Sequence, residues 1–225
     1  MRLAIKTSFW WYLASITILS LGVVVSALQF PGGFDWFYIV ASALASRRDN
    51  PAGYIWYASA FGLSMALLLP YTSALVKDFG NTNSAASRFA IVALRTGLVC
   101  GILLGIEGLI VPDLSRWIPK GHEILGISSF LGLYMGILVL LFPAIRHRKV
   151  YALPAVLVAI SVLAIGVTQL VLYLEQRGTG WINTEWREMG IPFWLSYAFW
   201  QWMAIGSLIA GLGLLSLIHN EETDT

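Results

Sequence analysis

Apolar residues fill this chain in six long runs separated by short polar links. None of the runs alternates apolar and polar residues, as a strand with one buried face does. At ~1.5 Å of helix per residue, each run is long enough to cross the ~30 Å hydrocarbon core of a bilayer. We therefore predict an all-α polytopic membrane protein, with a single transmembrane domain over residues 1–225. The predicted helices lie near residues 9–29, 52–76, 89–111, 123–143, 151–174 and 191–218.

The link after the first run contains a further apolar segment, residues 34–45, which is too short to span a bilayer. It is preceded by Pro31-Gly32-Gly33 and followed by Asn50-Pro51, and both groups are typical of chain breaks. The pattern predicts a short helix that lies in the membrane interface or re-enters between the spanning helices.

The first run could be mistaken for a secretory signal. Arg2 and Lys6 precede it, and Val25-Ser26-Ala27 resembles a cleavage triplet. Because residues 9–28 are long enough to span, we expect them to form the first transmembrane helix instead.

Composition supports the membrane assignment and excludes other classes. The chain is 58% hydrophobic and 12% charged, which is more apolar surface than a soluble domain of this length can bury. A net charge of +2, spread along the chain, does not favour nucleic-acid binding. The single cysteine, Cys100, excludes an intrachain disulfide and a cysteine metal cluster, and we expect it to pack as a small apolar residue.

Basic residues predict the orientation. If the N-terminus is cytoplasmic, more basic residues lie inside than outside, and the densest group, Arg146-His147-Arg148-Lys149, lies inside. We predict that both termini are cytoplasmic, in the plasma or cytoplasmic membrane.

With this orientation, tryptophans and acidic residues gather on the outer side. Aromatic belts normally occur at both membrane interfaces, so an excess on one side indicates contact with a second molecule. We expect membrane lipids, or other membrane subunits, to bind there. The aromatic candidates are Trp36, Trp117, Trp181, Trp186, Trp194 and Trp200. Near the inner side, Arg95 is a further candidate, for lipid phosphate or for an acid such as Asp78; the alternative is that it only snorkels to the interface.

Two lines of small residues predict a helix pair. Gly97, Gly101 and Gly105 recur every fourth residue in one run, and Ser128, Gly132 and Gly136 do so in the next. Because small residues let helix backbones approach closely, we predict that these two helices pack as an antiparallel pair.

Several acids accompany one histidine on the outer side. An acid inside a membrane helix, such as Glu107, is costly and marks a functional or structural polar contact, unless it snorkels to the interface. Carboxylates beside an imidazole can serve as general acid and base or hold a metal. The alternative is that these residues are loop charges and helix caps, a role that suits Glu123 at the start of a helix. The candidates for a catalytic site are His122, Asp113, Glu107 and Asp35.

Other chemistries lack their motifs. The sequence contains no nucleophile elbow, phosphate-binding loop, dinucleotide-binding motif or H-E-x-x-H. A three-histidine zinc site is excluded by distance, because His122 is predicted outside and His147 and His219 inside. Haem between the inner pair is not favoured, because both histidines sit at helix ends beside charges. We expect no metal and no cofactor.

The helix plan, together with short motifs in two loops, resembles the DRAM/Frag/Sfk family and its prokaryotic relatives of unknown function. The matching residues are Asp35, Ser42, Asn50, Pro51, Gly105, Asp113 and His122. The resemblance implies a membrane protein associated with lipid handling, including the remodelling of lipid-anchored proteins, without established catalysis. A more distant resemblance to membrane hydrolases of the alkaline ceramidase type would require several further histidines, and their absence counts against a zinc hydrolase.

These observations leave three functional hypotheses. The first is a non-enzymatic membrane protein that binds a lipid or a membrane partner through its outer aromatic and acidic face, as an accessory subunit of a complex. The second is a lipid-modifying hydrolase or transferase that uses His122 with outer carboxylates. The third is a small-solute transporter, which would need polar groups at the midplane of several helices.

Overall fold

Six long helices make up most of this computed structural model, which describes residues 7–79, 85–110, 118, 120–147, 149–174 and 190–220. All six are long and apolar enough to cross a membrane. No strand is found among the described residues. The predicted all-α fold with six spans is therefore confirmed, and it indicates an integral membrane protein. The helices are α1 (Thr7–Leu28), α3 (Tyr54–Phe79), α4 (Ala85–Ile110), α6 (Gly121–His147), α7 (Lys149–Leu174) and α8 (Tyr197–Asn220).

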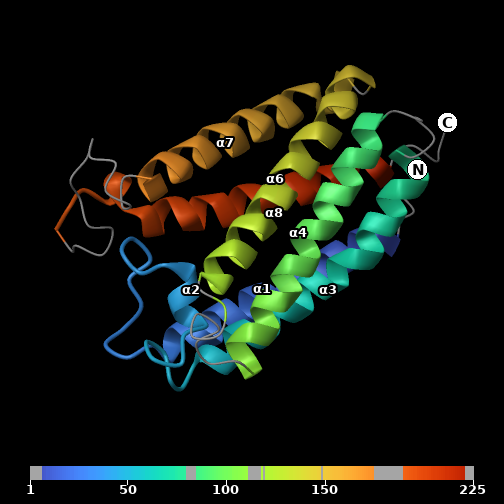
Figure 1. Cartoon of the computed structure of the whole chain (residues 1–225). Helices are drawn as coiled ribbons and strands as arrows, with labels where there is room; N and C mark the ends of the chain where they lie inside the picture. The colour runs from blue at the N-terminus through green and yellow to red at the C-terminus, as the bar shows by residue number, and fades with distance from the viewer. Residues whose placement is uncertain are drawn as a thin grey trace.

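Consecutive long helices pack against one another, and α8 returns to contact α1 and α6 (Figure 1). The start of α1 and the end of α8 lie at the same end of the bundle (Figure 1). Of the six spans, α8 is the most buried and α7 the least. We call the opposite end, which carries residues 29–53 and the start of α6, the His122 end.

The bundle is held by close packing of fully buried apolar side chains. Leu94 of α4, Ile137 and Leu141 of α6, and Leu215 of α8 are 0% exposed. Lipid tails are as apolar as these side chains, so association of the helices depends on shape and dispersion contacts more than on the hydrophobic effect.

Glycines set the contact between α4 and α6. A Cβ added at Gly97 would lie 2.8 Å from the Leu133 nitrogen, and one at Gly132 would lie 2.7 Å from the Gly97 nitrogen. The two backbones therefore touch at this point. Gly136 faces the Leu94 side chain of α4. Ser129 also takes part in this contact, because a Cβ at Gly101 would lie 3.2 Å from Ser129 Oγ.

The glycine line of α4 does not face one helix throughout. A Cβ at Gly105 would lie 2.6 Å from the Cα of Gly62, which belongs to α3. Four residues turn an α-helix by about 400°, so positions four apart drift ~40° round the axis. Over the two steps from Gly97 to Gly105 the line therefore moves from α6 towards α3, and Gly101 lies between them.

Most helix ends fall within a few residues of the predicted ones, but the last helix begins later than predicted. It starts at Tyr197 instead of residue 191. Before it lies η2 (Phe193–Leu195), a 3-10 helix of one turn. The residues on either side of η2, Pro192 and Ser196, have extended backbones (ψ 133° and 126°). The apolar run begins earlier than the helix because the segment before α8 contains aromatic residues that contact the loop following α1.

The link between α1 and α3 contains the predicted short helix, α2 (Ala41–Leu44), which is a single turn. Its residues Ala41, Ala43 and Leu44 are buried. It contacts α1, α3 and α8. The link is thus folded onto the ends of three helices.

Candidate functional site

The two candidate residues that the structure brings together are Glu107 and His122. Glu107 lies one turn from the end of α4, and His122 is the second residue of α6. Since the two helices are antiparallel neighbours, His122 Nδ1 and Glu107 Oε2 share a hydrogen bond of 2.7 Å. The Glu107 side chain is 13% exposed and the His122 side chain 42%. The acid in the apolar helix therefore has a specific partner instead of reaching for water.

This pair has the geometry of a positioned general base. The carboxyl group of Glu107 bonds to His122 Nδ1 and thereby fixes the imidazole ring. The other ring nitrogen, Nε2, belongs to a half-exposed side chain and is left to exchange a proton. Among the residues that the structure describes, no group of three His, Cys, Asp or Glu side chains is placed to hold a metal ion. The pair can do acid-base chemistry on a molecule that reaches Nε2.

Of the two remaining carboxylate candidates, the structure describes Asp35, which makes a local contact. Asp35 Oδ1 accepts a hydrogen bond of 2.8 Å from the Phe37 backbone N–H, so this carboxyl group caps a turn. Asp113 lies outside the described residues. In the described part of the chain, the site is a dyad.

Asn50 holds the His122 end together and was not recognised as such from the sequence. It is 0% exposed. Its Nδ2 donates to Ser26 O at 3.1 Å, Ser26 Oγ at 2.9 Å and Leu44 O at 3.3 Å, and its Oδ1 accepts from Gly53 N at 3.1 Å. One amide thus joins the end of α1, the end of α2 and the start of α3. A Cβ at Gly53 would lie 2.7 Å from Asn50 Oδ1, so the approach requires glycine.

Arg47 attaches the same link to the end of α4. Its guanidinium donates a hydrogen bond to the Leu109 carbonyl, and it lies 4.8 Å from the centre of the Tyr54 ring. The carbonyls in the last turn of a helix have no partner within the helix, and a cation is favourable there. The residue therefore links the loop to the helix that carries Glu107.

Aromatic side chains pin residues 30–39 to the start of α8. Trp36 lies 5.0 Å from Trp202, and Phe37 lies 5.3 Å from Phe193 (ring centroids). Hydrogen bonds accompany these contacts: Trp202 Nε1 donates to Ile39 O at 3.2 Å, and Gln201 Oε1 accepts from Ala41 N at 2.7 Å.

Part of the predicted aromatic excess thus serves the fold. Trp200 donates its indole N–H to the Trp194 carbonyl at 2.7 Å and is half-buried. Trp36 and Trp194 keep exposed rings, at 44% and 56%. The other tryptophan candidates, Trp117, Trp181 and Trp186, lie outside the described residues.

Arg95 lies far from this end, on α4. Its Nε and NH2 atoms donate to Thr72 Oγ1 and Ser73 Oγ of α3, both at 3.3 Å. Arg95 is exposed, while the side chain of Asp78, its proposed alternative partner, is outside the described part of the chain. The structure thus gives Arg95 two hydroxyl partners on the neighbouring helix.

Comparisons with known proteins add no relative: no family model, curated protein or solved structure matches this chain. The resemblance to the DRAM/Frag/Sfk family therefore rests on the sequence motifs alone. Of the residues that carry it, Asp35, Asn50, Gly105 and His122 have defined contacts in the structure.

Proposed function

We propose that this membrane protein binds a lipid through an aromatic surface at the His122 end. This aromatic surface consists of Trp36, Phe37, Phe193 and Trp194, whose exposed fractions run from 40% to 56%. The observation that carries the proposal is that the exposed rings are held by contacts with other rings. Trp36, Phe37 and Phe193 pack against Phe34, Phe199 and Trp202, with centroids 4.8–6.2 Å apart, and Trp194 packs against Phe193 at 5.2 Å. A surface of fixed rings loses little conformational entropy on binding.

The exposed indoles suit a lipid at the level of its head group. No hydrogen bond from the described residues engages the indole N–H of Trp36 or Trp194, whereas those of Trp200 and Trp202 donate within the chain. A free N–H at the edge of an apolar ring matches the boundary where lipid ester and phosphate oxygens meet acyl chains. Of the acids on the predicted face, Asp35 caps a turn.

Lipid retention tests this proposal. The protein with Trp36→Ala and Trp194→Ala, purified in mild detergent, should retain clearly less phospholipid than the natural sequence, as measured by quantitative mass spectrometry. A matched control is Trp10→Ala at the opposite end of the bundle, since Trp10 is 54% exposed and Trp194 56%. Equal retention in all three proteins would refute lipid binding at this surface. Loss of a co-purifying membrane protein from the double variant alone would point to an accessory subunit instead.

The second candidate function is a lipid-modifying hydrolase or transferase, and the 2.7 Å bond between His122 and Glu107 specifically favours it. In this reaction class, His122 Nε2 would take a proton from water or from a hydroxyl group of the acceptor, with Glu107 orienting the ring. General-base catalysis of this kind contributes ~10²–10⁴-fold to a rate.

Turnover of lipid extracts by the protein in liposomes tests this candidate. His122→Ala should abolish turnover, and Glu107→Gln should reduce it, while Asp35→Asn should leave it unchanged because Asp35 caps a turn. Turnover that persists in folded His122→Ala protein would exclude the assignment.

A further inference from the structure

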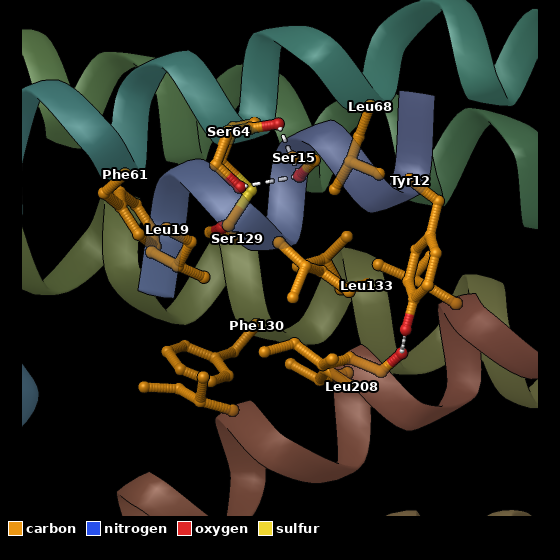
Figure 2. A pocket seen from close by; sticks show the side chains of 15 residues that line it. Tyr12, Ser15, Leu19, Phe61, Ser64, Leu68, Ser129, Phe130, Leu133 and Leu208 are labelled. Carbon is orange, nitrogen blue, oxygen red and sulfur yellow. Dashed lines mark hydrogen bonds between the residues drawn. The ribbon is translucent and has the colours of Figure 1, made fainter. Parts of the chain in front are cut away.

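A cavity of about 50 Å³ lies inside the bundle, away from the His122 end. Its walls come from α1, α3, α6 and α8, and side chains of all four helices point towards the same space in Figure 2. Ser15, Ser64 and Ser129 lie together on one side, and Phe61, Phe130 and Leu208 are among the apolar residues that surround them.

The cavity is elongated along the helices and lies near the middle of the spans. Three helices line it over eight-residue stretches: residues 12–19, 61–68 and 205–212. At ~1.5 Å per residue, each stretch is about 10 Å long. These stretches fall well inside the spans Ser8–Leu28, Tyr54–Leu75 and Tyr197–Ile218. The cavity is therefore at the depth where the ends of lipid chains meet.

Most polar groups in the wall are already satisfied within the protein. Tyr12 donates its hydroxyl to Ile209 O at 3.1 Å, and Ser15 donates to Ser64 O at 3.0 Å, with the two serine hydroxyls 2.7 Å apart. Ser129 lies on the same wall and is also buried, at 2% exposed.

We propose that this cavity holds the end of a single hydrocarbon chain of a membrane lipid. An ordered water needs two to four polar partners, and the hydroxyls of Tyr12, Ser15 and Ser64 on this wall are already paired within the protein. An empty space would forfeit dispersion contacts on every side. Inside a bilayer the surrounding solvent is hydrocarbon, so a chain end is the available filler of an apolar space. A cavity this small has room for one chain.

This site is separate from the aromatic surface, because none of the residues of that surface lines the cavity. A hydrocarbon chain in the cavity would therefore be bound in addition to the lipid proposed at the aromatic surface. The two proposals can fail independently, and the test below tells them apart.

Photolabelling in nanodiscs provides the test, with a phosphatidylcholine that carries a diazirine near the methyl end of one acyl chain. The label should map by mass spectrometry to residues 61–68 of α3 and 205–212 of α8. Filling the cavity by Ser129→Leu, and separately by Leu208→Trp, should reduce this labelling about fivefold or more, because a filled site has no room for the chain. Ser128→Leu is the matched control, since Ser128 does not line the cavity. Leu163 of α7, which is 58% exposed, should label equally in every variant.

Two further arms complete the design. A free fatty acid with the same diazirine is compared with the phospholipid probe, to show whether the chain enters attached to a phospholipid head group. Labelling of the cavity wall by either probe supports the site. The double variant Trp36→Ala and Trp194→Ala should still label the cavity wall. Absence of wall labelling with both probes, or labelling that neither filling variant reduces, would overturn the proposal. A density map that shows only water in the cavity would do the same.

Discussion

The hydrogen bond between Glu107 and His122 explains how an acid is tolerated near the end of an apolar helix. A carboxyl group in a membrane helix is costly, and this one is 13% exposed. The imidazole meets it from the next helix at 2.7 Å. The pair therefore has a structural role whether or not it also has a chemical one.

Removing the imidazole should destabilise the fold more than altering the acid. His122→Ala leaves Glu107 without its partner, so we expect the free energy of unfolding to fall by about 1–3 kcal/mol. Glu107→Gln keeps a side-chain oxygen that can accept, so its loss should be smaller. Thermal unfolding in one detergent measures both. Asp49→Asn is the control, because the Arg48 to Asp49 pair is exposed and worth little. Equal losses from both changes would contradict this account.

Asn50 makes a comparable prediction for the link between α1 and α3. Asn50→Leu removes bonds to Ser26, Leu44 and Gly53 and leaves buried backbone groups unpaired, so we expect a loss of about 1–3 kcal/mol in unfolding free energy. Gln29→Leu, at an exposed position of the same link, should change stability little. Chemical denaturation of the two variants compares them. A neutral Asn50→Leu would show that the network does not stabilise the fold.

Sequence patterns predicted some of these residues and missed others for a physical reason. Glu107 and His122 stood out because a titratable group in or beside an apolar run is unusual. Asn50 read only as a chain break before Pro51, because its partners are oxygens that lie as far as 24 positions earlier in the chain. Hydrogen bonds to backbone carbonyls leave no residue-type signature, so the role of Arg47 at the Leu109 carbonyl was equally hidden.

At the scale of the helices, the apolar runs predicted the spans well because bilayer thickness sets their length. The ends of the helices were less predictable, because a helix can continue beyond the point where its side chains become polar. For example, α3 ends at Phe79, after the apolar run predicted to end at residue 76. The aromatic segment before α8 was predicted to be helical because it is apolar, but its rings contact the loop after α1. Tertiary contacts of this kind override a local pattern.

The contact between α4 and α6 predicts opposite effects for two glycines. Gly97→Ala would place a Cβ 2.8 Å from Leu133 N, a backbone atom that cannot move aside, so we expect a loss of about 1–3 kcal/mol in unfolding free energy. Gly126→Ala meets nothing within 4 Å and should be neutral or stabilising by up to ~1 kcal/mol, because alanine favours helix. Thermal unfolding of the two variants gives the comparison. Similar behaviour at both positions would show that the close approach does not matter.

At the scale of the whole molecule, the even number of spans places the start of α1 and the end of α8 at one end of the bundle (Figure 1). The sequence predicted this arrangement, but it predicted the use of the tryptophans less well. They were read only as a surface for a second molecule, but Trp36 and Trp202 also fix the loop after α1 to α8. Whether a ring is buried against a distant segment depends on the folded chain. A run of aromatic residues in the sequence therefore does not predict it.

The distribution of basic residues predicts the orientation of the bundle in its membrane, and cysteine labelling can test it. Arg88 at the start of α4 and Lys120 just before α6 are exposed and lie at opposite ends of their antiparallel pair. In a Cys100→Ala background, we expect Lys120→Cys to react with an impermeant maleimide from outside intact cells. Arg88→Cys should react only after the membrane is permeabilised, because basic residues are retained in the cytoplasm.

The two other outcomes separate the fold from its orientation. The reverse pattern would keep the six spans but turn the His122 end towards the cytoplasm, so the aromatic surface would meet the inner leaflet and its anionic lipids. Reaction of both cysteines from one side would contradict the six-span arrangement itself, since α4 and α6 each have to cross the bilayer once for their ends to lie apart.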